Sequence, residues 1–290
     1  MRPPRRALLA ALVAGLAARA LGLGRKGGAL PPPDGPSAQD LEHRGTLVRL
    51  WTPAAPHERT RAVAFSHGAN ASARRYDELC HGLAEAGHAV AAVTHPDSPE
   101  HPASRRPTSP ADGWRQRLAD LRAALDLLAT RFPGRPLAVA GHSYGALVAQ
   151  ALGGARVAWA GDGGPLPDPR VRRVVAFSPP GPLPSVIGAE GFAAIAVPLF
   201  VATGTADVVP PVATTWEAHL ASFEAATISP RWAWVGDRVD HYFGNRIGRP
   251  ERAFDERQAR LFGHALAAAV AFLEELGPPP AADGVRLLVR

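Results

Sequence analysis

The 290-residue chain is predicted to fold as an α/β protein, with a mostly parallel central sheet covered by helices on both faces. Apolar runs of strand length alternate along the chain with longer runs of helical periodicity, an order typical of parallel strands joined by crossover helices. Three of the apolar runs also lead into turns that carry Ser, Asp or His. Functional residues of open parallel sheets lie at such carboxyl ends of strands, so the same pattern predicts the place of a site.

The expected strands are short and apolar, and they span residues 46–51, 61–66, 88–94, 137–141, 171–177, 197–203 and 232–235. Helices are expected over residues 76–86, 113–132, 146–152 and 251–276. The helix over 113–132 is the most regular, because Trp114, Leu118, Leu121, Leu125 and Leu128 recur at helical spacing. Residues 153–169 form an insertion, and residues 285–289 form either an edge strand or a loose tail. Residues 178–196, which are apolar and rich in Pro and Gly, form a small lid or one wall of the acyl pocket, or else an ordinary excursion of the chain.

The chain divides into four parts. Residues 1–20 are typical of a signal peptide or N-terminal anchor, because a basic start is followed by an apolar stretch and by Ala18-Arg19-Ala20, a cleavage-site pattern. A Pro/Gly-rich linker is expected over 21–45, one catalytic domain over 46–276 and a tail over 277–290. We therefore expect export to the periplasm or the medium, with membrane anchoring or transient membrane association through the N-terminal segment as the alternative.

Composition excludes several classes of function. Residues 1–20 carry four arginines and no acidic residue, so without them the formal charge falls from +6 to +2, and nucleic acid is not an expected partner. Lys26 is the only lysine, which excludes lysine-based catalysis in the domain. A single cysteine excludes an intramolecular disulfide, and neither a phosphate-loop nor an H-E-x-x-H motif occurs. No metal or organic cofactor is expected.

Residues 137–152 read LAVAGHSYGALVAQAL and contain the most informative motif of the chain. Gly141, Ser143 and Gly145 form G-x-S-x-G between an apolar strand and a small-residue helix, which is the context that this motif requires. The turn would hold Ser143 as a nucleophile in a strained backbone conformation, and the glycines would let neighbouring chain segments pass closely. The amide of Tyr144 would then face a developing oxyanion. The alternative is an ordinary turn before a helix.

An acid and a base are needed beside such a serine, and each has a candidate at a strand end. Asp207 follows the strand over 197–203, and His241 follows the strand over 232–235. The order Ser143, Asp207, His241 is that of one hydrolase architecture. Asp237 and Asp240 are the alternative acids, although an acid so near His241 in sequence rarely reaches its Nδ1.

The alternative bases are His264, in the expected helix over 251–276, and His219, in a further segment that is expected to be helical. His142 adjoins the nucleophile and is expected to point into the sheet. A second oxyanion donor is expected from the turn after the strand over 61–66, where Gly68 would allow the amide of Ala69 to face the serine. The alternative there is a simple strand-ending turn with His67 as a buried hydrogen-bonding residue.

With these motifs the chain resembles the α/β-hydrolase superfamily over about residues 45–276. Within it, the segment FSHGANASARRYDELCHGLAEAGHAVAAVTHPDS is similar to the dienelactone-hydrolase-like group, which includes platelet-activating-factor acetylhydrolase and bacterial polyester hydrolases. The resemblance implies Ser143 as nucleophile, Asp207 as acid and His241 as base. Dienelactone hydrolase itself uses a cysteine nucleophile, whereas Cys80 here lies in the helix after the His-Gly turn.

The sequence therefore predicts a serine hydrolase that cleaves carboxylic esters through an acyl-enzyme, acting on a small-molecule or lipid-like ester. The alternatives are an acyltransferase or an amide or thioester hydrolase with the same triad, and a non-catalytic binding protein on the same scaffold.

Overall fold

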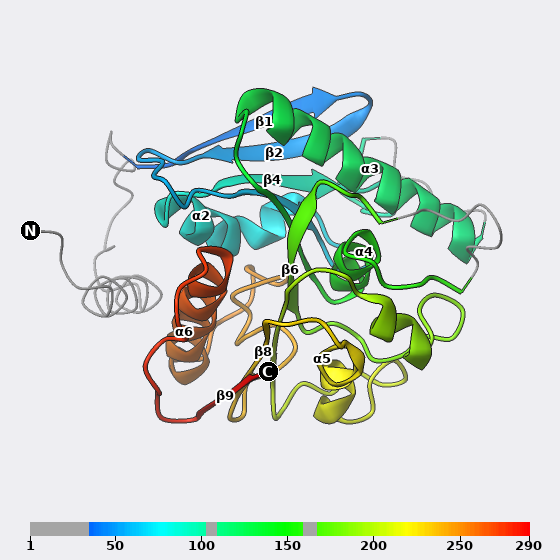
Figure 1. Ribbon diagram of the computed structural model, residues 1–290, viewed down its shortest axis with the longest axis vertical. Coiled ribbons are helices and arrows are strands. Elements are labelled where there is room, and N and C mark those ends of the chain that lie inside the picture. The colour runs from blue at the N-terminus through cyan, green and yellow to red at the C-terminus, as the bar shows by residue number, and fades with distance from the viewer. Residues whose placement is uncertain (1–34, 103–108, 159–166) are drawn as a thin grey trace, which may run out of the picture.

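The computed structural model describes residues 35–102, 109–158 and 167–290 (Figure 1). The expected N-terminal segment over 1–20 and most of the expected linker lie outside the described residues, as does part of the insertion over 153–169. Among the described helices, none combines the length and the hydropathy that a bilayer span requires.

One nine-stranded sheet runs through the described part of the chain, in the order β1-β2-β4-β3-β5-β6-β7-β8-β9. The six strands from β4 to β8 in this order are mutually parallel, and β2 and β9 flank them antiparallel, with β1 pairing antiparallel to β2. This confirms the predicted mostly parallel sheet. The strands are β1 (Ser37–His43), β2 (Thr46–Thr52), β3 (Ala62–Ser66), β4 (Ala89–Thr94), β5 (Leu137–His142), β6 (Val171–Phe177), β7 (Leu199–Gly204), β8 (Arg231–Gly236) and β9 (Val285–Val289).

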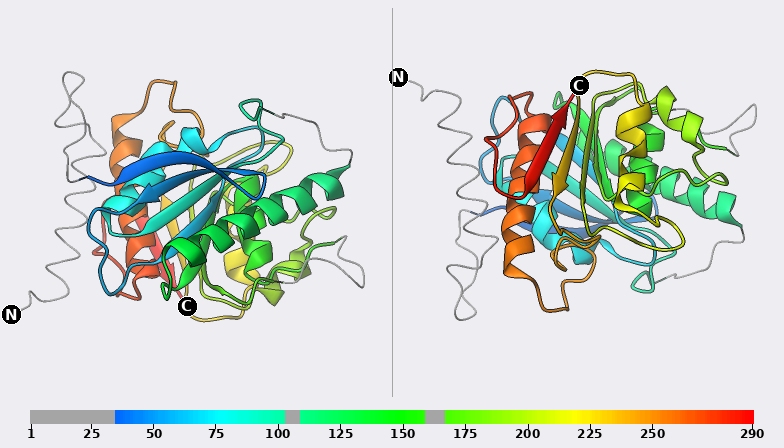
Figure 2. Two further views of the ribbon diagram at one scale, coloured as in Figure 1. Left: turned by 90° about the horizontal axis from the view of Figure 1, so that it is seen from above. Right: turned by 90° about the horizontal axis from the view of Figure 1, so that it is seen from below.

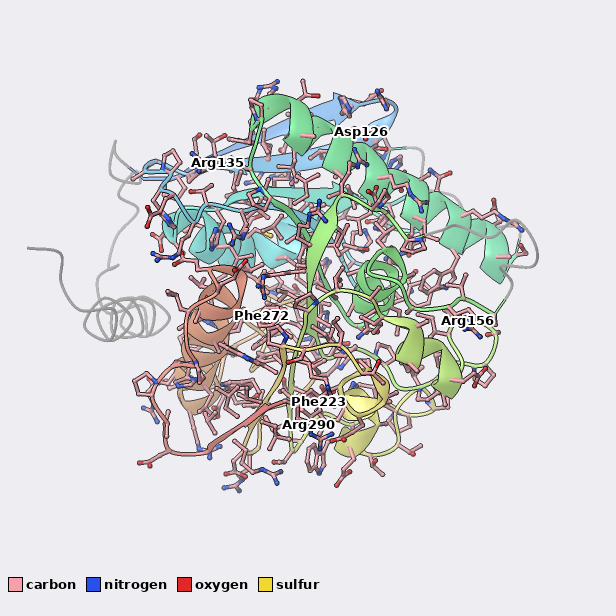
Figure 3. All side chains as sticks on the ribbon, in the orientation of Figure 1. Asp126, Arg135, Arg156, Phe223, Phe272 and Arg290 are labelled. Carbon is pink, nitrogen blue, oxygen red and sulfur yellow. The ribbon has the colours of Figure 1, made fainter. Side chains whose placement is uncertain are left out.

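Helices cover both faces of the sheet, as Figure 2 shows for α3 and α6. One face packs against α3 (Pro110–Arg131), α4 (Tyr144–Leu152) and α5 (Ala221–Ala225), and the other against α2 (Asp77–Glu85) and α6 (Glu256–Leu273). Strand side chains alternate between the two cores, so that Ala64 of β3 joins the first and Phe65 the second. Phe223 of α5 and Phe272 of α6 lie in opposite cores (Figure 3).

Two predicted boundaries change. The linker expected to run to residue 45 ends earlier, because Ser37–His43 forms the edge strand β1 in register with β2. Its side chains are mostly exposed, so its sequence lacks the apolar alternation that reveals a half-buried strand. At the other end of the chain, Val285–Val289 forms an edge strand along β8 and is not loose.

The longest helix starts before its apolar pattern does. α3 begins at Pro110, and the Ser109 hydroxyl accepts the Asp112 N–H at 3.0 Å as an N-cap. The closing helix is shorter than the expected 251–276, because Asp255 caps its first turn by accepting the Gln258 N–H at 2.8 Å.

Residues 178–196 pack into the core on the α4 side. Ile187 and Phe192 are fully buried there, and the segment carries a short 3₁₀ helix, η2 (Ala189–Ala194). The segment therefore packs against the domain and does not form a detached lid. Two further 3₁₀ helices, η1 (Ala73–Tyr76) and η3 (Trp216–Leu220), lie close to the site described next.

Candidate active site

Ser143 lies at the turn between β5 and α4 with φ 52° and ψ −123°, a conformation that is costly for a residue with a side chain. Both flanking glycines are required by close backbone contacts. A Cβ on Gly141 would lie 2.3 Å from the carbonyl oxygen of Gly145, and a Cβ on Gly145 would lie 2.1 Å from that of Ser66. The strand–turn–helix context predicted for the motif is present, and Ser143 is only half-buried.

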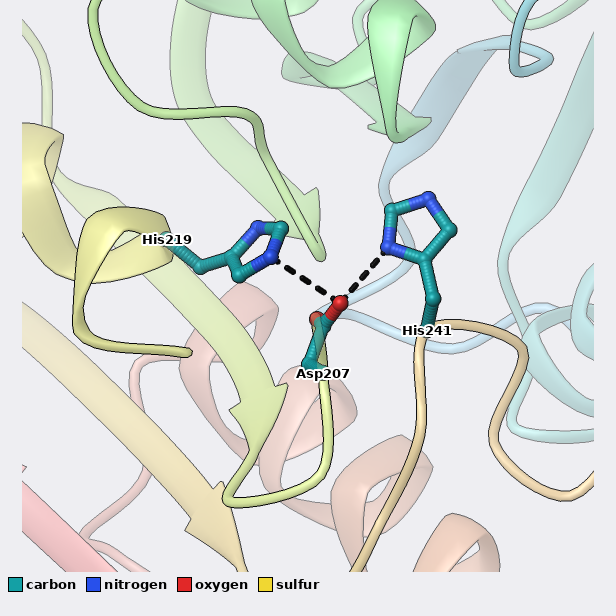
Figure 4. Close-up of side chains that lie close together, drawn as sticks. All are labelled: Asp207, His219 and His241. Carbon is teal, nitrogen blue, oxygen red and sulfur yellow. Dashed lines mark hydrogen bonds and ion pairs between the residues drawn. The ribbon is translucent and has the colours of Figure 1, made fainter. Parts of the chain in front are cut away.

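Asp207 and His241 meet at the carboxyl ends of β7 and β8, as Figure 4 shows. The Nδ1 of His241 lies 2.7 Å from Asp207 Oδ1, and the Thr203 hydroxyl donates to Oδ2 at 2.8 Å. Because an ionised carboxylate can only accept, the Nδ1 of His241 carries the proton, which leaves Nε2 as the basic nitrogen. Burial alone would raise the pKa of the Asp207 carboxyl, but the interactions with His219 and His241 outweigh it and hold that pKa well below its usual range.

The two alternative acids are engaged elsewhere. Asp240 accepts the backbone N–H groups of Tyr242 and Gly244 at 2.9 and 3.0 Å and so shapes the loop that carries His241. Asp237 pairs with Arg257 at 2.6 Å near the surface. The structure therefore brings Asp207, and not its neighbours in sequence, to the base. His264 lies away from the site in α6, where its Nδ1 accepts the indole N–H of Trp234 at 3.0 Å.

Among the described residues, no hydrogen bond joins the Ser143 hydroxyl to His241. The connection between the two segments is His142, which precedes Ser143 in the chain and contacts His241. The ring of His142 lies 4.8 Å from that of His241, and its Nε2 donates to the His241 carbonyl at 2.8 Å. Its Nδ1 accepts the Tyr76 hydroxyl at 2.9 Å. His142 is buried at the end of β5, and its two hydrogen-bond partners come from η1 and from the loop that carries His241.

A hydrogen-bonded chain continues from His142 to the His-Gly turn. The Gly68 N–H donates to the Tyr76 hydroxyl at 3.0 Å, which in turn donates to His142. Burial lowers the pKa of His142 to about 3, so the ring stays neutral and keeps this donor and acceptor pattern at ordinary pH. Tyr76 was visible in the sequence only as part of a family resemblance, and its role as a connector comes from the fold.

The His-Gly turn is held by a buried arginine. The Arg117 guanidinium, 2% exposed, donates to the carbonyls of His67 and Gly68 at 2.7 and 3.2 Å and pairs with Asp97 at 2.7 Å. In a trans peptide the N–H points opposite the C=O, so the Ala69 N–H faces away from Arg117. A Cβ on Gly68 would lie 3.5 Å from the Ser143 Cβ, so the turn contacts the nucleophile.

The structure shows the buried, hydrogen-bonded His67 that was one expectation for this turn, and the oxyanion role of Ala69 stays a prediction. His67 is fully buried and hydrogen-bonded, since its Nδ1 donates to the Gly68 carbonyl at 2.6 Å and its Nε2 accepts the His95 N–H at 3.0 Å. Within the described residues, no protein acceptor meets the Ala69 N–H. The first N–H groups of α4, beginning with Tyr144, also lack an intrahelical acceptor by geometry. Ala69 and Tyr144 thus present free amides on the two segments next to Ser143.

A second histidine, His219 of η3, contacts Asp207 on the side opposite His241 (Figure 4), with its Nε2 3.0 Å from the same Oδ1. The ligand atoms of these three residues lie within 4.8 Å of one another, a set that could hold a transition metal. However, tetrahedral zinc with bonds of about 2.0–2.1 Å would space its ligands about 3.3 Å apart. The separations to Oδ1, 2.7 and 3.0 Å, instead fit protons on the two nitrogens.

Comparisons with known proteins agree with this fold. Residues 57–163 match the family described as "Serine aminopeptidase, S33". The solved structure of TT1662 from Thermus thermophilus superposes with a TM-score of 0.56 at 22% identity, covering 83% of this chain and 97% of that one. A Mycobacterium tuberculosis puromycin-hydrolyzing peptidase superposes with a TM-score of 0.57 at 18% identity, covering 89% of this chain and 44% of that one.

The comparison with curated proteins finds no match. At these identities the two structures show a shared fold alone, and the resemblance to dienelactone-hydrolase-like enzymes stays a prediction. The sheet order and the turn that holds Ser143 are those of an α/β-hydrolase fold, and the match over residues 57–163 supports a hydrolase of the serine type.

Proposed function

We propose that this hydrolase cleaves carboxylic esters through an acyl-enzyme formed on Ser143, with His241 as general base and Asp207 as the acid of the triad. The observation that carries the proposal is the 2.7 Å contact between Asp207 and His241 Nδ1, at a sheet edge shared with the strained Ser143. This contact fixes the tautomer in which Nε2 can accept a proton from a hydroxyl.

In the first half-reaction, His241 Nε2 takes the Ser143 proton as the hydroxyl oxygen attacks the ester carbonyl. The negative charge that develops on the carbonyl oxygen is stabilised by the amides of Tyr144 and Ala69, each worth about 2.7–4 kcal/mol of barrier. His241 then gives its proton to the departing alkoxide, so that the alcohol leaves and the acyl group stays on Ser143.

In the second half-reaction, water replaces the alcohol. His241 takes a proton from the water as it attacks the acyl-enzyme, and the same two amides stabilise the second oxyanion. Ser143 recovers its proton from His241 when the acid product leaves. Throughout, Asp207 faces an imidazole that is alternately neutral and positive, and its negative charge lowers the free energy of the positive form.

The second candidate is hydrolysis of an amide at a free N-terminus, which the name of the matched family favours. Such an enzyme binds the substrate's α-ammonium group, for which a carboxylate is the strongest partner. Of the described carboxylates near Ser143, Asp207 is engaged by two histidines, and Asp97 is paired with Arg117. That both are already paired favours a neutral ester over an amino-terminal peptide.

The test compares two substrate series on one preparation of the enzyme. A panel of p-nitrophenyl esters of graded acyl length is assayed beside aminoacyl p-nitroanilides, with Ser143→Ala as the control for background hydrolysis. The proposal expects ester turnover that the variant loses while remaining folded. Higher kcat/KM on the anilides would favour the aminopeptidase reading, and substantial ester turnover by folded Ser143→Ala would refute the nucleophile.

A further inference from the structure

His219 is a buried histidine whose two ring nitrogens both face oxygen atoms. Its Nδ1 lies 2.8 Å from the carbonyl oxygen of Pro179, and its Nε2 lies 3.0 Å from Asp207 Oδ1. The side chain is 1% exposed and the Asp207 side chain is 0% exposed, so water does not separate them. A catalytic triad needs only one histidine bonded to its acid, and here that histidine is His241. His219 takes part in no step of the proposed reaction.

The two oxygens determine the protonation of the ring. A carbonyl oxygen can only accept, so Nδ1 of His219 carries a proton. If the ring were neutral, an unprotonated Nε2 would lie 3.0 Å from a carboxylate oxygen, and the two electron-rich atoms would repel each other. A second proton on Nε2 removes this conflict and makes the ring an imidazolium. The contact is poorly directed for a hydrogen bond, so the attraction between the two groups depends on charge.

We propose that His219 is a positioning residue that stays positively charged beside Asp207 and thereby sets the pH range in which His241 can act as the base. This inference rests on the proposed function, since it concerns the acid of the same triad. His219 would thus be a fourth side chain of the triad's surroundings. It would carry its charge before His241 accepts the Ser143 proton.

The groups that face His219 come from three neighbouring loops and its own helix. The loop after β7 supplies Asp207, the loop after β8 supplies His241 with its ring 5.7 Å away, and the loop after β6 supplies the Pro179 carbonyl. His142 lies further along and stays neutral, because burial lowers its pKa to about 3. On η3 itself, Glu217 is exposed to solvent.

These surroundings favour the charged ring. Burial alone would lower the pKa of His219, but the Asp207 carboxylate and the Pro179 carbonyl outweigh it, and the pKa lies above its ordinary value. The two oxygen contacts and the raised pKa therefore both indicate an imidazolium at His219.

A fixed positive charge at His219 raises the free energy of the state in which His241 is also protonated. When His241 accepts a proton, a second cation forms 5.7 Å from the first, and both share one carboxylate oxygen. Repulsion between them makes this second protonation less favourable than it would be beside an uncharged residue at position 219. Removing the charge at position 219 should let His241 stay protonated to higher pH.

The experiment measures kcat/KM against pH for the wild-type chain, His219→Gln and His264→Gln on one p-nitrophenyl ester. Glutamine keeps an N–H donor near Asp207 without the charge. His264 is the matched control, because it is also a buried histidine bonded to a proline carbonyl, at 3.0 Å from Pro280, but it does not contact the triad. Thermal melts establish that each variant is folded.

We expect the midpoint of the acidic limb to move up by about 1–2 pH units in His219→Gln, the size expected for one charge at this distance and an effective dielectric constant of about 20–40. The midpoint should not move in His264→Gln. A purely structural role for His219 would lower the melting temperature or the plateau rate and leave the midpoint in place, and that result would overturn the inference.

A second readout does not depend on turnover. The ¹⁵N NMR signals of the histidine rings distinguish an imidazolium from a neutral ring, and His219→Gln identifies the signals of His219. An imidazolium at pH 7 supports the inference, and a neutral ring at that pH overturns it. If the wild-type chain shows neither ester turnover nor labelling of Ser143, the proposed function fails, and the NMR signal still decides the charge of His219.

Discussion

Replacement of Asp207 by asparagine should reduce kcat/KM for ester hydrolysis by about 10³–10⁴-fold, equivalent to roughly 4–5.5 kcal/mol. The structure shows why an uncharged isostere is not a mild change. Both histidines contact the same oxygen, Oδ1, while Thr203 faces Oδ2. An asparagine must place either its oxygen or its NH₂ group at the Oδ1 position, and each choice is harmful.

With the amide oxygen at the Oδ1 position, His241 keeps its tautomer but loses the negative charge that stabilises its imidazolium. A hydrogen bond to a charged partner is worth about 1.5–3 kcal/mol, and the stabilisation of the imidazolium by the carboxylate charge is lost as well. With the NH₂ group there, the proton of His241 is driven to Nε2, and the base is lost.

The matched control is Asp240→Asn. The Oδ1 of Asp240 accepts the N–H groups of Tyr242 and Gly244, and an asparagine oxygen can accept both. We expect kcat/KM to change by less than about fivefold, equivalent to roughly 1 kcal/mol. The assay is initial-rate hydrolysis of a p-nitrophenyl ester at pH 8, with a thermal melt of each variant. A larger loss in Asp240→Asn than in Asp207→Asn would refute the assignment of the acid.

Four further outcomes are expected. Gly145→Ala should destabilise the fold by about 3 kcal/mol or more, because its Cβ would meet the Ser66 carbonyl at 2.1 Å, whereas Gly277→Ala, with open space around it, should leave the melting temperature unchanged. Urea unfolding should show a lower free energy of unfolding at pH 5 than at pH 7. Burial lowers the pKa of His88 and of His142 to about 3 in the folded chain, so both rings stay neutral there. In the unfolded chain each ring gains a proton below about pH 6.5, which lowers the free energy of unfolding at pH 5 by about 2 kcal/mol per histidine. His219, with its raised pKa, opposes this loss, and a flat or rising profile would contradict the account. The mature protein should begin near residue 21 by mass spectrometry, and an intact Met1 in a soluble cytoplasmic pool would refute export. EDTA should leave ester turnover unchanged, and complete loss would overturn the mechanism.

The sequence predicted those parts of the site that depend on local backbone geometry. The Ser143 turn was predictable because steric contact requires glycine at positions 141 and 145, and this requirement is visible as a motif. Asp207 and His241 were predictable as residues that follow apolar strands, since parallel strands bring their carboxyl ends to one edge. Each of these inferences needs only a few neighbouring residues and the strand order.

The remaining contacts join segments that are distant in the chain. Arg117 lies on the helix α3, whose sequence pattern indicates only that the leucines are buried. The burial of Arg117 depends on the carbonyls of His67 and Gly68, which accept its hydrogen bonds. The sequence indicates His219 only as an alternative base on an expected helix. Its position on Asp207 depends on where η3 packs against the loop at Pro179. No local pattern contains that information.

The edge strand β1 was missed for a different reason. An outer strand with both faces largely exposed has little apolar surface to bury, and its residues, SAQDLEH, show no alternation. It forms because β2 offers free backbone groups along its length, a property of the sheet and not of the segment.

The central claim is that Ser143 is the nucleophile, and labelling by a fluorophosphonate tests it most directly. The full chain is incubated with the probe, and intact mass, peptide mapping and residual ester turnover are followed together. The account predicts one adduct per chain, located on Ser143, with turnover lost in proportion to labelling and no adduct on folded Ser143→Ala. An adduct on another residue, or a folded wild-type chain that hydrolyses esters without being labelled, would contradict it.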